Sequence, residues 1–101
     1  NNLTDAANYL NQIRNRAGLA NTAATTQSEL RNAIAAERRF ELVGEGHRWF
    51  DLLRTGQAIS VMNAWFTGEG LNIQIDENDL LMPIPLSQIN TDPAITQNPG
   101  Y

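Results

Sequence analysis

Residues 35–54 read AAERRFELVGEGHRWFDLLR and hold four of the seven arginines, four of the eleven acidic residues and the only histidine. At 100° per residue, this stretch and the residues before it give one apolar stripe, made of Leu30, Ala33, Ile34, Phe40 and Val43. Glu37 and Glu41 lie near the middle of that stripe. Because an unpaired charge on a buried face is very costly, both carboxylates need cationic partners. We therefore predict two helices held together by a carboxylate–guanidinium network.

A second, shorter helical pattern follows the Gly44-Glu45-Gly46 break. Its apolar face, which we assign to the core, consists of Trp49, Phe50, Leu52 and Leu53. Every cation of the chain is an arginine, whose planar fork suits partly buried carboxylate pairs better than lysine does. The predicted partners are the arginines that lie nearby in the sequence. The predicted structural network comprises Glu37, Arg38, Arg39, Glu41, His47, Arg48, Asp51 and Arg54.

The same acidic and histidine side chains could instead form a metal site or a general acid–base pair. Guanidinium groups argue against both, because they favour the charged carboxylate and compete with a cation for its oxygens. A small hydrolase using Glu37, Glu41 or Asp51 is therefore the weakest of the functions considered. We predict no catalytic residue, no metal and no cofactor. The acidic loop at 76–79 lacks the glycine and glutamate spacing of an EF-hand and is interpreted as a solvated turn.

Apolar periodicity predicts helices at residues 4–17, 27–43, 47–54 and 57–66. Gly18 suits the left-handed position after the first helix, and Leu19 would be the hydrophobic partner of a Schellman motif. Thr26 and Glu29 have the spacing of a capping box at the start of the second helix. The first two helices are joined by a short connection, which favours an αα-hairpin.

The C-terminal third has a different pattern. Residues 71–75 alternate between apolar and polar side chains and predict a short strand or an extended segment. Pro83 and Pro85 fix an extended backbone, and residues 86–89 allow one helical turn. Residues 90–101 are expected to lie over the helices as irregular chain. The sequence thus predicts a mainly α fold with an irregular, proline-containing C-terminal tail.

Composition sets further bounds. A chain of 101 residues is expected to form a single domain. Its net charge of −4, without any basic run, disfavours binding to nucleic acid. The absence of cysteine excludes disulfides and thiolate metal sites. No apolar run approaches the roughly 20 residues of a membrane-spanning helix.

Three motifs in one order resemble the SusD/RagB family. The first is YLNQIRNRAGL at residues 9–19, similar to a family helix that ends in R-x-RAGL. The second is ERRFEL followed by EGHRWFDLLRTG, at residues 37–42 and 45–56. The third combines LMPIP at residues 81–85 with the ending QNPGY at residues 97–101. The resemblance covers residues 1–101 as a C-terminal segment of longer family members.

This resemblance implies a tetratricopeptide-like helical scaffold within a surface lipoprotein of the outer membrane. Such proteins bind oligosaccharide without being enzymes and deliver it to a SusC-like, TonB-dependent transporter. The lipidated N-terminal cysteine and the N-terminal helices of such proteins are absent from this sequence. We therefore expect the faces that would meet the missing portion to form an apolar patch that self-associates. Trp65, at a helix end, is the candidate for stacking against a sugar ring. The alternative is a helical protein–protein interaction module that binds no sugar.

Overall fold

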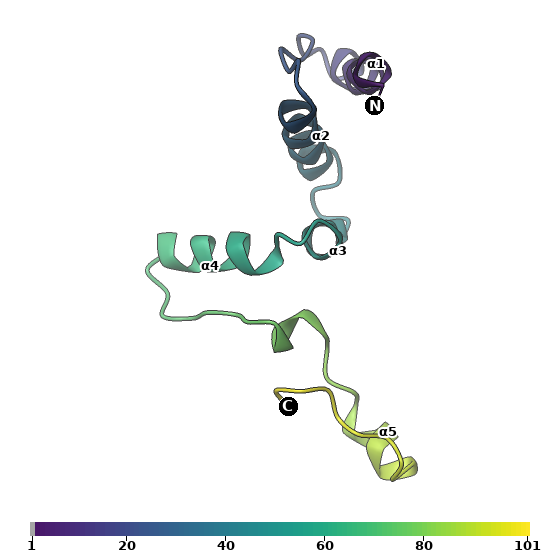
Figure 1. Ribbon diagram of the computed structural model, residues 1–101, viewed down its shortest axis with the longest axis vertical. Helices are drawn as coiled ribbons and strands as arrows, with labels where there is room; N and C mark the ends of the chain where they lie inside the picture. Colours follow the sequence, from purple (N-terminus) through teal and green to yellow (C-terminus); the bar gives the residue numbers. More distant parts are fainter. Residues whose placement is uncertain (1) are drawn as a thin grey trace. The chain divides into compact units, whose positions relative to one another are not determined.

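The computed structural model describes residues 2–101, and the chain divides into two compact units, one ending at Arg48 and the other beginning at Trp49. All regular secondary structure within residues 2–101 is helical, which confirms the predicted mainly α class (Figure 1). The elements are α1 (Leu3–Arg16), α2 (Gln27–Glu41), α3 (His47–Arg54), α4 (Ala58–Gly68), the 3₁₀ helix η1 (Asn78–Leu80) and α5 (Leu86–Thr91). No helix among these residues is both long enough and apolar enough to cross a bilayer.

The ends of α1 and α2 follow local sequence signals. After α1, the Gly18 N–H donates to the Asn15 carbonyl (3.0 Å) and the Leu19 N–H donates to the Arg14 carbonyl (2.9 Å). Gly18 has a φ of +74°, so this is the predicted Schellman motif. At the start of α2, the Glu29 N–H donates to Oγ1 of Thr26 while the Glu29 carboxylate accepts from the Thr26 N–H, which confirms the capping box.

The connection between α1 and α2 turns back along α1. Arg14 Nε donates to the Ala20 carbonyl (2.8 Å), and the Thr22 N–H donates to Oδ1 of Asn11 (2.8 Å). As the connection advances, it therefore contacts earlier residues of α1. Helix α2 then runs forward, so that its last turn lies beside the last turn of α1. The two helices pack together, but in the same general direction rather than as the antiparallel αα-hairpin that the short connection predicted.

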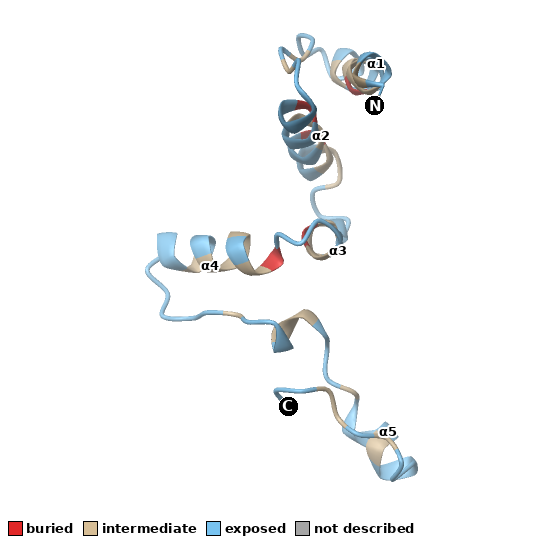
Figure 2. Cartoon of the chain, viewed as in Figure 1, coloured by how far each residue is buried: buried red, intermediate tan, exposed pale blue. Residues whose placement is uncertain are grey.

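The buried residues are few and belong to four helices (Figure 2). The first unit buries Leu10, Leu30 and the charged Glu37. Phe40 is 73% exposed, so its predicted place on the buried stripe of α2 is wrong, as is that of Val43. The side of α2 that faces α1 is centred on Leu30 and Glu37, and Phe40 lies at the edge of that stripe, where no part of the first unit covers it.

In the second unit, α3 and α4 are joined by a tight turn. Helix α3 ends as α1 does, with the Gly56 N–H donating to the Leu53 carbonyl (3.0 Å) and the Gln57 N–H to the Leu52 carbonyl (2.9 Å). Leu52 and Ala58 are buried on either side of this turn. Phe50 was predicted to be core but is exposed, because it lies two residues, or 200°, from Leu52 on the helix. Trp49 is half-buried.

Residues 71–75 form no strand and run as an extended segment. The Asn63 side chain of α4 holds its end: Oδ1 accepts from the Ile75 N–H (2.8 Å) and Nδ2 donates to the Ile75 carbonyl (3.0 Å). One amide side chain thereby satisfies both backbone groups of a residue that has no neighbouring strand.

Side chains of the tail bind the backbone of residues 81–84. The Gln97 side chain accepts from the Ile84 N–H (2.7 Å) and donates to the Ile84 carbonyl (2.9 Å). Asn98 Nδ2 donates to the Met82 carbonyl (2.6 Å) and the Tyr101 hydroxyl donates to the Leu81 carbonyl (3.2 Å). Prolines on either side of Ile84 interrupt any backbone ladder, so side chains of the tail provide the hydrogen bonds instead.

Candidate functional site

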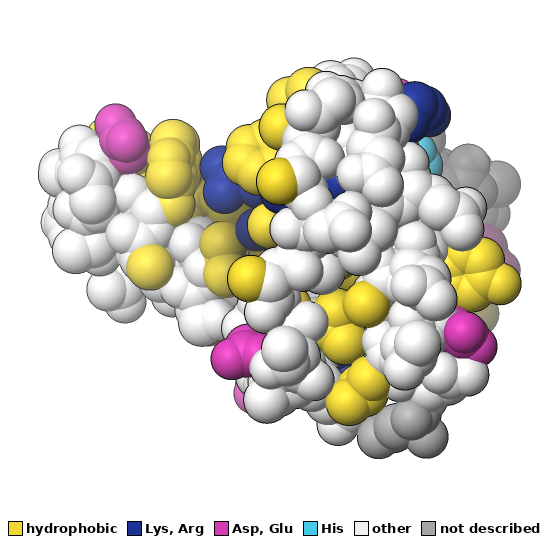
Figure 3. All heavy atoms as spheres, turned by 90° about the horizontal axis from the view of Figure 1, so that it is seen from above, with side chains coloured by type: hydrophobic (Ala, Val, Ile, Leu, Met, Phe, Trp, Pro, Cys, Tyr) yellow, Lys and Arg dark blue, Asp and Glu magenta, His cyan; other side chains and the backbone are white. Residues whose placement is uncertain are grey.

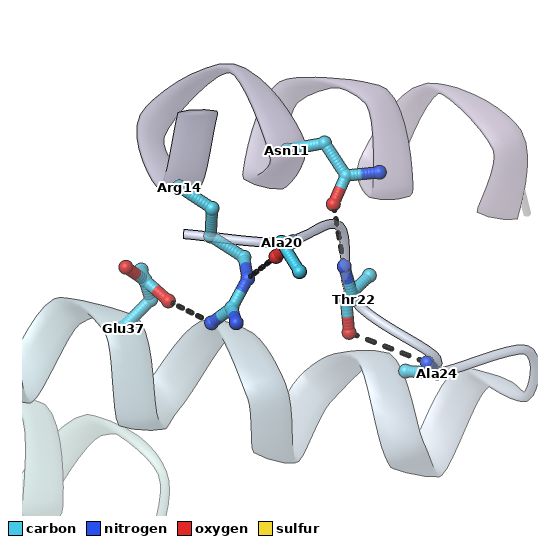
Figure 4. Close-up of polar contacts among 6 residues, drawn as sticks. All are labelled: Asn11, Arg14, Ala20, Thr22, Ala24 and Glu37. Carbon is cyan, nitrogen blue, oxygen red and sulfur yellow. Dashed lines mark hydrogen bonds and ion pairs between the residues drawn. The ribbon is translucent and has the colours of Figure 1, made fainter. Parts of the chain in front are cut away.

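Arg14 and Glu37 form the most buried ion pair of the first unit. Arg14 Nη1 lies 2.7 Å from Oε2 of Glu37, while Nε of the same guanidinium donates to the Ala20 carbonyl (Figure 4). The Glu37 side chain is 7% exposed and the Arg14 side chain 28%. A single guanidinium thus binds both helix α2 and the connecting segment. This geometry fixes the position of α1 relative to α2 and to the connection.

A second ion pair lies one turn further along, between Arg16 and Glu41, where it is open to solvent. The carboxylates were predicted to pair with arginines nearby in the sequence, but both partners come from α1. The spacing of Glu37 and Glu41, four residues apart on one face, indicated that partners were needed. Arg14 and Arg16 are also two residues apart near the end of α1, which could have indicated that they pair with the two glutamates. The sequence analysis did not match these arginines with Glu37 and Glu41.

Other members of the predicted network have contacts within their own helix or turn. Asp51 accepts from Nε of Arg54 (2.8 Å) within α3. His47 Nε2 is 3.9 Å from Oε2 of Glu45, and both side chains are exposed. The structure leaves Arg39 exposed on α2, whereas Arg38 and Arg48 are half-buried. Glu37 and Glu41 thus pair with α1 within the first unit, and Asp51 pairs with Arg54 within the second.

Among residues 2–101, no group of three or more His, Cys, Asp or Glu side chains could hold a metal ion. Each of the two carboxylates at the heart of the predicted network, Glu37 and Glu41, is already paired with an arginine.

Trp65 is the exposed aromatic of the second unit that sequence analysis singled out. Its side chain lies on α4 and is 52% exposed. The neighbouring Phe66 ring lies 5.3 Å away, centroid to centroid, at an interplanar angle of 57°. In this tilted aromatic pair, part of the indole stays accessible to solvent. This arrangement suits stacking of a flat ligand on the exposed part of the indole.

The SusD family model matches residues 1–101. Three curated proteins of Formosa agariphila are similar to the chain. SusD-like protein P2 is 34% identical over 110 residues, covering 97% of this chain and 21% of the relative. SusD-like protein P25 is 32% identical, covering 100% and 21%, and SusD-like protein P38 is 31% identical, covering 97% and 20%.

The chain therefore spans about a fifth of the length of the curated relatives that it matches. No solved structure matches it significantly. The three motifs noted in the sequence have clear structural counterparts: R-x-RAGL and ERRFEL supply the α1–α2 ion pairs, and LMPIP and QNPGY bind each other. Because the family model covers the whole of this sequence, the chain belongs to the SusD family.

Proposed function

We propose that this chain is part of a nutrient-binding protein that takes up oligosaccharide and passes it to a SusC-like, TonB-dependent transporter. The observation that carries the proposal is the match of the SusD family over residues 1–101. The outer membrane surface, with attachment through an N-terminal lipid, is the location that this family membership favours. The protein acts by binding, without catalysis.

Within such a protein, this segment serves mainly as scaffold. Its most prominent charged motifs are used internally, since Arg14 and Arg16 pair with Glu37 and Glu41. The LMPIP and QNPGY motifs are likewise used on each other, through the Gln97 amide and the Ile84 backbone. Side chains that are already paired in this way hold elements in place and have little capacity left for a ligand.

Trp65 is the residue of this segment that we assign to sugar contact. Sugar rings present flat C–H faces that pack against an exposed aromatic plane, and the Trp65 indole is half exposed and held beside Phe66. Neither Trp65 nor Phe66 carries a charge, which fits a neutral oligosaccharide.

The test is a titration of the chain with a panel of oligosaccharides, followed by tryptophan fluorescence and calorimetry. Only Trp49 and Trp65 contribute to the signal. A saturable change that persists in Trp49→Phe and weakens about tenfold in Trp65→Ala would support sugar contact by Trp65. Binding that is equally strong in both variants would remove Trp65 from the site. If no oligosaccharide of the panel changes the fluorescence or releases heat, this segment serves as scaffold alone.

The second candidate function is that of a helical protein–protein interaction module. It is favoured by the large apolar side chains left at the surface, among them Phe40, Phe50 and Met82. A module of this kind would bind a protein partner, such as the transporter, in the absence of any sugar. Pull-down with and without oligosaccharide separates the two functions.

A further inference from the structure

The turn that follows α5 contains the one Asp-Pro sequence of the chain, Asp92-Pro93. Asp92 is held at three points. Its N–H donates to the Gln88 carbonyl (3.0 Å), its carbonyl accepts from the Ile95 N–H (3.0 Å), and its carboxylate accepts from the Ala94 N–H (3.0 Å). The backbone is extended, with φ −131° and ψ 100°, as a following proline favours. The carboxylate and the carbonyl group of this residue are therefore fixed relative to each other.

The carboxylate of Asp92 spans the bond that joins this residue to Pro93. The Ala94 N–H that it binds comes after that bond, so the side chain folds forward across the bond, as in an Asx turn. A carboxylate oxygen is a nucleophile, and its attack on the carbonyl carbon of its own residue closes a cyclic anhydride. Holding the two reacting groups together in this way lowers the entropic cost of the reaction.

The carbonyl group at this bond is polarised by a fixed donor. The Ile95 N–H donates to the Asp92 carbonyl oxygen, which becomes negatively charged when a nucleophile adds to the carbon. A backbone N–H in this position stabilises the developing charge. The leaving nitrogen belongs to proline, a secondary amine, which takes up a proton more readily than the primary amines that other peptide bonds release. The other three prolines follow Met82, Ile84 and Asn98, which carry no carboxylate.

We propose that the Asp92–Pro93 bond is a self-cleavage site, which opens in mildly acidic solution and releases residues 93–101. One carboxylate oxygen of Asp92 bonds to its own carbonyl carbon, and the bond from that carbon to the Pro93 nitrogen breaks. The nitrogen keeps the electron pair and takes a proton from the solvent. The cyclic anhydride left on Asp92 then adds a water molecule and opens to two carboxyl groups. The net reaction is hydrolysis of the peptide bond.

Solvent supplies both the proton and the water. Asp92 and Pro93 are exposed, and Figure 3 shows acidic side chains at the molecular surface. No metal, cofactor or second protein takes part in the reaction. The turn itself therefore provides the nucleophile and the donor to the oxyanion, and acidity provides the trigger.

Cleavage also weakens the attachment of the tail. Gln97, Asn98 and Tyr101 hold the tail through side-chain hydrogen bonds to the backbone of residues 81–84. Such bonds contribute only about 1 kcal/mol each, which is sufficient while the tail belongs to the same chain. After cleavage the tail loses the high effective concentration that the covalent connection gave it. We therefore expect residues 93–101 to dissociate.

The test is incubation of the full 101-residue chain in a mildly acidic buffer in which circular dichroism shows that it is folded. Mass spectrometry should find two products, residues 1–92 and 93–101, and size-exclusion chromatography should separate them. Incubation in urea at the same pH removes the turn and should slow the cleavage about tenfold or more. An intact chain, or cleavage that is equally fast in urea, would overturn the self-cleavage site. Products that stay together on the column would contradict release of the tail.

Asp92→Asn is the matched variant, because the amide oxygen still accepts from the Ala94 N–H but is a much weaker nucleophile than a carboxylate. This variant should stay intact, and Pro93→Ala should be cut more slowly than the natural chain. Glu69→Gln removes a carboxylate outside the turn and should be cut at the natural rate. Equal cleavage of Asp92→Asn and the natural chain would show that solvent hydrolyses the bond without help from the side chain, and would overturn the proposal.

Discussion

Glu37 is the one charged residue among residues 2–101 that is buried, and Arg14 makes this burial tolerable. The guanidinium supplies the opposite charge, and the Ala20 carbonyl satisfies another of its donors. A buried pair of this kind contributes little net free energy compared with apolar packing, but loss of one partner is costly. The pair therefore specifies how α1, α2 and their connection fit together, more than it adds stability.

Glu37→Gln is expected to lower the free energy of unfolding by about 2–4 kcal/mol, because the amide keeps the shape of the carboxylate but leaves the Arg14 charge without its counter-ion. The loss of unfolding free energy should lie near the lower end of this range, since the Arg14 side chain retains some contact with solvent. Urea denaturation followed by circular dichroism provides the measurement. Glu41→Gln is the control: its pair with Arg16 is exposed, so the loss should stay below about 1 kcal/mol. Equal losses in the two variants would count against a specific role for Glu37.

Gln97 offers a second prediction at the scale of single residues. Gln97→Ala removes the donor and the acceptor that satisfy the Ile84 backbone, and should cost about 1–2 kcal/mol. Amide hydrogen exchange by NMR should show faster exchange at Ile84. Gln88→Ala, on the exposed surface of α5, should leave the Ile84 amide as protected as before. Unchanged protection in Gln97→Ala would show that this hydrogen-bonded pair does not hold the tail.

At the scale of elements, the helix ends are set by short-range hydrogen bonds. Glu29 has its pKa lowered to about 2, chiefly by hydrogen bonds from the Thr25 N–H and the Thr26 N–H. Because the pKa in the folded state lies below the ordinary value of 4.5, the charged carboxylate stabilises the start of α2. This contribution is complete above about pH 4.5 and is lost as the pH falls toward 2.

Acid titration of helix content should therefore differ between the natural chain and Glu29→Gln. Glutamine keeps the capping-box geometry but does not titrate, so part of the stability loss between pH 4.5 and 2 should disappear in the variant. Far-ultraviolet circular dichroism in urea at several pH values provides the measurement. Glu69→Gln makes the same change of charge outside a capping box. A Glu29→Gln curve parallel to that of the natural chain would refute this assignment.

At Gly100 the tail lies against Asn78 of η1. Gly100 has a φ of +96°, and a Cβ atom there would lie 2.7 Å from Cβ of Asn78. Gly100→Ala should destabilise the tail by about 1–3 kcal/mol, and limited proteolysis should cut it faster. Gly68→Ala is a control of opposite sign: it lies in α4, has no atom within 4 Å of the added Cβ, and should stabilise that helix by up to about 1 kcal/mol. Resistance of the Gly100→Ala tail to protease would contradict the predicted clash.

At the scale of the whole molecule, the sequence predicted the features that depend on neighbouring residues. The Schellman end at Gly18 and the capping box at Thr26 are examples, because each involves only a few consecutive residues. The partner of Glu37 was missed because Arg14 lies 23 residues away and is brought near only by the return of the connection along α1. The periodicity of apolar residues also located the apolar faces of the helices, but it did not show which part of each face another element covers. For this reason Phe50 was wrongly assigned to the core. Sugar contact by Trp65 stays a prediction.

Each compact unit buries leucine side chains, among them Leu10 in the first and Leu52 in the second. Leu10→Ala and Leu52→Ala should each cost about 2–5 kcal/mol, because truncation leaves a cavity where the side chain is almost completely buried. Residue-resolved hydrogen exchange distinguishes local from global effects. Leu10→Ala should accelerate exchange first in α1 and α2, and Leu52→Ala should do so first in α3 and α4. Equal acceleration across the chain in both variants would mean that the chain unfolds as one cooperative block, so that each small core depends on the other for its stability.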